Sequence, residues 1–434
     1  MKMKRLAFVG IVVLLCSLFL VALPAIAAEQ NQEMRKMSAM EATAASEVET
    51  LGIYGNANED DTIDMRDLTY VKLIFFGEKP KTEFADAKYD GEINPLDFVQ
   101  IKLIIVGKED ELTVVDTLDR TVTIDKPLER IVILNRNIIE VMRSLNVEKE
   151  KIVGVSSDVL KKKIFFPEFK DYPSIGSARS PDIEKILELE PDAVFIYATV
   201  MTEPWVQEQL EDADVTVVRV DCFKPENYIE EAEKLGYIFD KEEAAETFLG
   251  FYEDCMDRVA DKGTKIPEDE RPKVYYERLY GSYKVGGEGT GYDTFVEMAG
   301  GNYIFSDLSG YVVVDPEEVV MRDPEIIVKQ TYNRSNYGYN VDDTKGLEEV
   351  RDELMGRPEL ENVDAVKNNE VYVIIKELTA GKHFIAIGYM AKWFHPDIFA
   401  DLDPKAIHQE YLTRFQGLDF DLDEHGVFVY PEPS

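Results

Sequence analysis

Residues 242–262, EEAAETFLGFYEDCMDRVADK, form the stretch that decides the predicted fold. Its apolar side chains recur at steps of three and four residues, as Ala245, Phe248, Leu249, Tyr252, Cys255, Met256 and Val259. This spacing places them on one side of a helix more than about five turns long. We therefore predict a single long helix here, and the rest of the chain is interpreted around it.

Two similar segments flank this helix. Residues 180–196 read SPDIEKILELEPDAVFI, and residues 314–328 read VDPEEVVMRDPEIIV. Glu184 aligns with Glu317, and both segments end in an apolar run that is typical of a buried strand. The sequence therefore predicts two similar α/β lobes joined by one helix.

The composition limits the possible functions. The chain has 434 residues, enough for two or three domains, and a formal net charge of −37 at pH 7. So acidic a chain is unsuited to binding nucleic acid or an anionic membrane by charge. The four histidines form no close pair, and no nucleophile motif or nucleotide-binding loop is present. We therefore expect a protein that is not an enzyme and has no catalytic cofactor.

The first 28 residues are typical of a secretory signal peptide. Basic residues precede the apolar run Leu6–Leu23, and residues 25–28 (AIAA) offer a cleavage site. The run is also long enough to stay uncut as a membrane anchor. Residues 29–50 are small and polar, as expected of a linker. The mature chain is thus predicted to be secreted, at the cell surface or the outer face of the cytoplasmic membrane. Its two cysteines, Cys222 and Cys255, are either paired or free.

A repeat of about 30 residues follows the linker and suggests two calcium-binding loops. Residues 56–67 and 86–97 each place oxygen-bearing side chains at spacings suited to a hard cation, and each loop precedes an apolar helical run. The candidate ligands are Asn56, Asn58, Asp60, Thr62, Asp64 and Asp67 in the first loop, and Asp86, Asp90, Glu92, Asn94 and Asp97 in the second.

These paired loops resemble a dockerin, a small all-α module with EF-hand-like loops that docks onto a cohesin-type partner. The sequence departs from that pattern where Asn56 replaces the first Asp, Asp61 replaces a turn Gly, and Lys88 stands at a ligand position. Calcium is therefore expected in the first loop more than in the second. The alternative is a helical spacer whose loops bind no metal.

Beyond residue 112, short apolar strands alternate with helical segments, which predicts βαβ units and mainly parallel sheets. The domains expected are a signal peptide (1–28), a linker (29–50), the dockerin-like module (51–110), lobe 1 (112–232), an interlobe helix (233–265), lobe 2 (271–420) and an acidic tail (421–434).

Several phrases in residues 113–416 resemble the substrate-binding proteins of iron-complex and vitamin B12 importers. They include residues 130–134 (RIVIL), 152–155 (IVGV), 299–302 (AGGN) and 395–399 (HPDIF). The resemblance implies two Rossmann-like lobes bridged by a single helix, with a ligand between them. It implies capture of an iron complex, either a siderophore or haem, and its delivery to an ABC permease.

The same resemblance assigns roles to individual residues. Glu184 and Glu317 would dock the permease, the alternative being ordinary exposed residues in a first helical turn. The ligand-binding candidates are Asn135, Arg136, Ser156, Tyr197, Trp205, Tyr280, Gly287, Tyr332 and Arg334. Arg136, Arg278 or Arg334 would neutralise an anionic chelate, and His383 is a candidate axial ligand for haem or cobalt.

Two other functions stay open at this point. A corrinoid carrier of the same class is the nearest, and nothing in the sequence separates it from an iron-complex carrier. A surface-assembly or sensor protein, attached through the dockerin-like module, is the other.

Overall fold

The computed structural model describes residues 50–198, 201–279, 281–332 and 337–433. The predicted signal peptide and nearly all of the linker lie outside these residues, as do the candidate ligand residues Tyr280 and Arg334. In the described part of the chain, no helix is both long enough and apolar enough to cross a bilayer.

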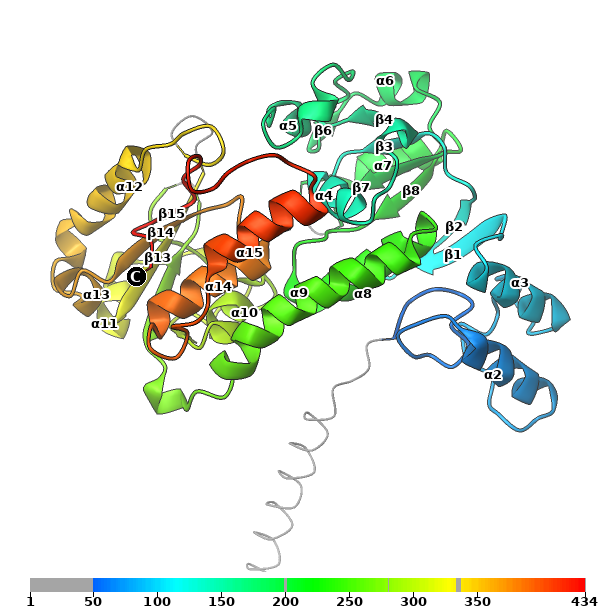
Figure 1. Ribbon diagram of the computed structural model, residues 1–434, viewed down its shortest axis with the longest axis horizontal. Helices are drawn as coiled ribbons and strands as arrows, with labels where there is room; N and C mark the ends of the chain where they lie inside the picture. The colour runs from blue at the N-terminus through cyan, green and yellow to red at the C-terminus, as the bar shows by residue number, and fades with distance from the viewer. Residues whose placement is uncertain (1–49, 199–200, 280, 333–336, 434) are drawn as a thin grey trace, which may run out of the picture. The chain divides into compact units, whose positions relative to one another are not determined.

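The long helix is α9, Glu242–Gly263, as the sequence predicts. It packs against α8 (Pro225–Ile238) and α4 (Arg136–Ser144), and against α10 (Tyr292–Met298) and α14 (His383–Phe394) (Figure 1). Its apolar stripe is buried in these contacts, including Phe248, Tyr252 and Val259.

The expected interlobe helix over 233–265 is in fact the end of one helix and the whole of another. The α8 helix ends at Ile238, and α9 begins only at Glu242. Asp240 lies between them with φ of 53°, a left-handed conformation that a continuous helix does not allow. The apolar periodicity carries across this turn, so the break leaves no clear sign in the pattern.

Lobe 1 is built on a four-stranded parallel sheet in the order β4-β3-β7-β8. Its strands are β3 (Ile131–Ile133), β4 (Ile152–Val155), β7 (Ala193–Ile196) and β8 (Thr216–Arg219). The helices between them are α4, α5 (Ser157–Leu160), α6 (Ile183–Glu188) and α7 (Pro204–Glu211), and a short hairpin joins β5 (Gly176–Ser177) to β6 (Ser180–Pro181).

Lobe 2 contains a five-stranded sheet in the order β11-β9-β13-β14-β15. Its strands are β9 (Lys273–Glu277), β11 (Asn302–Tyr303), β13 (Ile326–Thr331), β14 (Val371–Ile375) and β15 (Val429–Tyr430), parallel except for β15. Around it lie α10, α11 (Pro316–Arg322), α12 (Lys345–Met355), α13 (Asp364–Lys367), α14, α15 (Pro404–Glu410), a π-helical turn (Tyr411–Phe415) and the pair β10 (Lys284–Gly286) and β12 (Tyr311–Val313). The two mainly parallel sheets confirm the predicted α/β fold.

The C-terminal residues 421–434 are not the separate acidic tail that the composition suggested. Strand β15 pairs with β14 at the edge of the sheet, and Val427 bridges to Gly338. Leu422, Phe428 and Val429 are buried in the core. The acidic residues Asp421, Asp423 and Glu424 are exposed and precede the apolar run of residues 427–430 that holds the segment in place.

The repeat module forms two similar helices, α2 (Met65–Phe75) and α3 (Pro95–Ile105). Each begins with a capping box, made by Asp64 with Asp67 in α2 and by Asn94 with Asp97 in α3. The adjoining hairpin of β1 (Glu111–Val115) and β2 (Thr121–Asp125) shares its apolar core with the module, and Ile53 bridges to Val114.

Candidate ligand-binding cleft

A cleft lies between the two lobes. It opens beyond the carboxyl end of β14, where Lys376 and Glu377 directly follow the last strand residue. In open α/β sheets this is the usual location of a small-molecule site. The lining residues are Lys161, Lys162, Ile164 and Phe165 from lobe 1, and Tyr332, Tyr337, Tyr339, Asn340, Ile375, Lys376 and Glu377 from lobe 2.

The cleft is rich in cations although the whole chain is strongly acidic. The pKa of Lys376 is lowered to about 8, mainly by burial and also by the nearby charges of Arg136, Arg278 and Lys162. Burial also lowers the pKa of Lys162 to about 8, against the opposing effect of Glu377. Such shifts mean that positive charges have been gathered in a poorly solvated place, which favours an anionic ligand.

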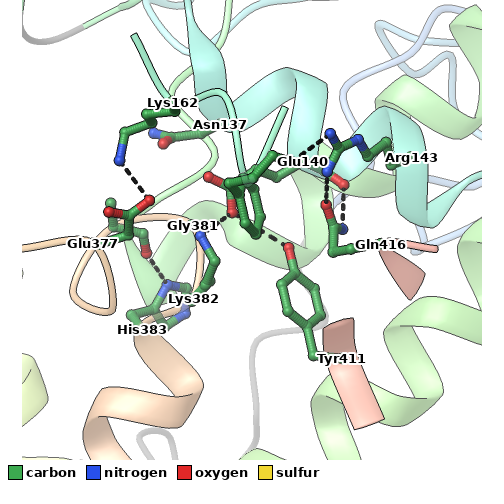
Figure 2. A network of polar contacts seen from close by, with 12 residues as sticks. Asn137, Glu140, Arg143, Lys162, Glu377, Gly381, Lys382, His383, Tyr411 and Gln416 are labelled. Carbon is green, nitrogen blue, oxygen red and sulfur yellow. Dashed lines mark hydrogen bonds and ion pairs between the residues drawn. The ribbon is translucent and has the colours of Figure 1, made fainter. Parts of the chain in front are cut away.

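Glu377 is the single carboxylate among the described residues that line the cleft. It forms an ion pair with Lys162 across the lobes, and Figure 2 shows the two side chains pointing toward each other. Burial alone would raise the pKa of Glu377, but Lys162, Lys382 and Arg136 together lower it to about 2. Glu377 is therefore charged throughout the physiological pH range.

Aromatic side chains complete the walls. Phe165 of lobe 1 stacks on Tyr339 of lobe 2, with ring centroids 5.1 Å apart. The Lys376 ammonium lies 5.9 Å from the ring centre of Tyr332. Aromatic faces next to cations suit a ligand that combines flat rings with negative charge.

Below the cleft, a buried polar network fastens the lobes together. Lys382 donates to Glu140 Oε2 at 2.6 Å, and the Gln416 amide donates to the Glu140 carbonyl at 2.9 Å and to Ser144 Oγ at 3.0 Å. Arg143 reaches the Gln416 side-chain oxygen at 3.3 Å (Figure 2). The sequence interpretation missed this network, because it joins residues more than 240 positions apart.

A comparison with known protein families identifies the class to which the chain belongs. Residues 104–378, more than half of the chain, match the model of the periplasmic binding proteins. The chain belongs to the periplasmic binding protein family. Members of this family serve ABC importers as substrate-binding proteins and are not enzymes.

Curated relatives of this binding protein differ in ligand. The molybdate-binding protein MolA of Haemophilus influenzae is 23% identical over 339 residues, which span 70% of this chain and 90% of MolA. The petrobactin-binding protein YclQ of Bacillus subtilis is 31% identical over 163 residues, which span 37% of this chain and 50% of YclQ.

Solved structures share the fold. MolA bound to molybdate superposes with a TM-score of 0.59 at 20% identity, over 71% of this chain and 99% of MolA. The TroA-like protein FepB of Veillonella parvula gives a TM-score of 0.61 at 24% identity, over 73% of this chain and 98% of FepB.

Three of the predicted ligand residues, Arg136, Tyr197 and Tyr332, follow strand ends. Arg136 and Tyr197 are neighbours, since the charge of Arg136 lowers the pKa of Tyr197 against the larger effect of burial. Glu377 and Tyr332, which line the cleft, also raise the pKa of Arg136, but Arg136 is not itself among the lining residues. Trp205 is exposed on α7 and is not among the residues that line the cleft.

Three other predicted ligand residues are buried. Asn135 is buried, caps α4 and donates its amide to the Val220 and Asp221 carbonyls. Ser156 is buried at the start of α5. At Gly287 a Cβ atom would lie 2.1 Å from the Leu308 carbonyl, so close backbone packing explains the glycine.

The two glutamates assigned to permease docking occupy equivalent positions. Glu184 is the second residue of α6 after the N-cap Asp182, and Glu317 is the second residue of α11 after the N-cap Asp315. Both are exposed, one on each lobe. Within the described residues, neither carboxylate has an ion-pair partner. The duplicated segments thus produce duplicated local structure, with the carboxylates free to meet another protein.

The histidine and cysteine candidates are buried instead of facing the cleft. Burial lowers the pKa of His383 to about 3, and its ring nitrogens meet the Tyr252 hydroxyl at 2.8 Å and the Ala380 carbonyl at 3.2 Å. Axial ligation by His383 therefore does not fit this structure. Cys222 and Cys255 are buried and unpaired with each other.

The calcium-like loops are closed by their own contacts. The Asn56 amide donates to the Leu51 and Asp60 carbonyls, while Arg66 pairs with Asp60 and Asp64, both at 2.9 Å. In the second loop, Lys88 turns away to Glu111 at 3.2 Å. No group of three or more His, Cys, Asp or Glu side chains is arranged for a metal ion within the described chain. Calcium binding by the first loop stays a prediction that requires Arg66 to move.

Proposed function

We propose that this periplasmic binding protein captures an anionic iron chelate, a ferric siderophore, and delivers it to the permease of an ABC importer. The observation that carries the proposal is the charge of the cleft. Lys161, Lys162 and Lys376 line it, with Glu377 as the carboxylate among the lining residues, and the charge of Arg136 acts on both Lys376 and Glu377. Lys382 is already paired with Glu140. A net surplus of positive charge therefore remains for a ligand.

The tyrosines favour a chelate with flat rings. Tyr332, Tyr337 and Tyr339 line one wall, and Phe165 lines the other. Catecholate groups combine an aromatic face with negative charge, so they would stack on the rings and contact the lysines. The petrobactin-binding relative, which aligns over only half of its own length, adds support for a siderophore. Haem and corrinoids have no comparable support from the charges of the cleft.

A small oxyanion is the second candidate. MolA, whose name states molybdate binding, aligns with 70% of this chain. An oxyanion would be held by the same lysines and Arg136, without using the aromatic walls. The two candidates therefore share the cations and differ in their need for the tyrosines.

Calorimetric titration of residues 29–434 separates the candidates. A ferric catecholate, a ferric hydroxamate, haemin, a corrinoid and molybdate would each be titrated into wild-type protein and into Lys376→Met. We expect micromolar or tighter binding of the ferric catecholate, weakened about tenfold or more in the variant. Tyr332→Ala should weaken the catecholate and leave molybdate unaffected. Binding of the corrinoid alone would contradict the proposal.

The repeat module supports a further expectation about location. Its paired helices and loops retain the outline of a calcium-loop module, and we propose that it tethers the binding protein to a cohesin-like surface partner. A surface-assembly or sensor role, without import, is the alternative. If a strain that lacks the permease loses uptake while the protein still binds its ligand, the import role is favoured.

A further inference from the structure

We propose that Glu377 is a displaceable counter-ion of the cleft, so that an anionic ligand takes its place on Lys162 and releases this contact between the lobes. The inference rests on the proposed function, because it assumes a negatively charged ligand. It adds a specificity-determining residue that would exclude ligands with too little negative charge.

The position of the pair is the first argument. Lys162 follows α5 in lobe 1, and Glu377 follows β14 in lobe 2, so the ion pair spans the cleft mouth. Both residues line the cleft. A ligand that enters between the lobes must therefore meet this pair.

The second argument is the contrast with the buried pair below. Lys382 and Glu140 have side chains that are 0% and 4% exposed, and Tyr411 adds a contact to Glu140 at 3.4 Å (Figure 2). The Lys162 and Glu377 side chains are 10% and 16% exposed. Within the described part of the chain, Lys162 is the one side chain that donates a hydrogen bond to Glu377. A ligand anion can thus replace Glu377 on Lys162, whereas the Lys382–Glu140 pair is held by several contacts.

The third argument is competition for the same charges. Lys162, Lys382 and Arg136 stabilise the Glu377 carboxylate. A ligand anion would depend on two of them, Lys162 and Arg136. A neutral ligand cannot replace the carboxylate without leaving Lys162 unpaired in a poorly solvated site. An anionic ligand can, because one hydrogen-bonded ion pair replaces another.

The test compares the affinities of Glu377→Gln and a matched control for two anionic probes. Glu168→Gln is the control, because Glu168 pairs with Arg143 at 2.6 Å and its side chain is also 16% exposed, but it does not line the cleft. The probes are a ferric tris-catecholate complex and molybdate, titrated at pH 6.5 to keep the lysines protonated. Glu377→Ser is a second variant, and the melting temperature of each protein verifies its folding.

We expect both Glu377 variants to bind at least one probe about three- to tenfold more tightly than wild type, with Glu168→Gln unchanged. Tighter binding in the variants supports the inference even if wild-type binding is too weak to measure. Wild-type binding with equal or weaker binding by both variants overturns the inference and leaves the proposed function intact. No binding of either probe by any of the four proteins overturns both.

Discussion

Lys382 of lobe 2 and Glu140 of lobe 1 meet with Nζ and Oε2 only 2.6 Å apart, in a place closed to solvent. A buried charge is tolerated only when it is paired and hydrogen-bonded, so each residue makes the other necessary. This relationship joins α4 to the start of α14, beside the long helix α9. The lobes are therefore joined by a buried ion pair at the base of the cleft, in addition to the covalent chain.

Removing one partner of this pair should be severely destabilising. Lys382→Met leaves the Glu140 carboxylate buried without its cation, which costs about 3–5 kcal/mol in the free energy of unfolding. Glu140→Gln combined with Lys382→Met should recover much of that loss, because no unpaired charge remains. Chemical denaturation of the three proteins measures both effects.

A surface pair provides the comparison. Lys185 Nζ of α6 lies 2.7 Å from Oδ2 of the N-cap residue Asp182, but both side chains are well exposed, so Lys185→Met should destabilise the protein far less than Lys382→Met. Equal costs for the buried and the exposed lysine would show that the buried pair does not hold the lobes together.

The fold was largely predictable because its signals are local. Residues 242–262 carry the period of α9, and the two segments around Glu184 and Glu317 produce matching helices. The C-terminal strand β15 was not foreseen, because a two-residue strand at a sheet edge has too few residues to show a period.

The candidate site was less predictable because it is assembled from distant residues. Arg136 and Tyr332 were predicted from the family resemblance, and both obey the rule that ligand residues follow strand ends. Lys162, Lys376 and Glu377 were not, since lysines and glutamates are the commonest exposed side chains and their burial depends on tertiary contacts. Asn135 obeyed the same rule as Arg136, yet its side chain serves as a helix cap.

The paired glutamates should act in uptake and not in ligand binding. Glu184→Lys combined with Glu317→Lys reverses the charge at both equivalent positions, and we expect ligand uptake in cells to fall to background. Ligand affinity should stay within about twofold of wild type, because neither residue lines the cleft. Uptake assays and calorimetry together measure the two effects.

A control for this variant uses other exposed carboxylates on the same lobes. Glu188→Lys with Glu353→Lys makes the same change of net charge in α6 and α12. Uptake should persist in that protein. Loss of uptake in both double variants would point to net charge and not to a docking position.

The first calcium-like loop should respond to substitution of Arg66. Because Arg66 pairs with Asp60 and Asp64, Arg66→Ala removes a competing cation from two expected ligands. We expect calcium to raise the melting temperature of residues 29–434, and to do so at lower concentration in the variant. Asp60→Asn should abolish the response. A melting temperature that is insensitive to calcium and chelator in all three proteins would favour the helical spacer.

Binding of an anion should weaken as the pH rises through about 8. Lys162 and Lys376 have pKa values lowered to about 8, so both are charged at pH 6.5 and largely neutral at pH 9. Arg136 stays charged over this range, because nearby acidic groups raise its pKa despite burial. Glu377, with a pKa of about 2, does not titrate. We expect affinity for molybdate to fall about tenfold or more between pH 6.5 and pH 9.

Folding stability should change in the opposite direction over the alkaline range. Lysines with a folded pKa near 8 bind fewer protons than the unfolded chain between about pH 8 and 10.5, so their contribution to stability grows as the pH rises. Loss of affinity therefore cannot be attributed to unfolding driven by these lysines. Lys376→Met should flatten the pH profile of binding, while Lys185→Met, an exposed lysine outside the cleft, should keep it. If the affinity of the wild-type protein does not change between pH 6.5 and pH 9, the cleft lysines do not carry the charge that holds the ligand.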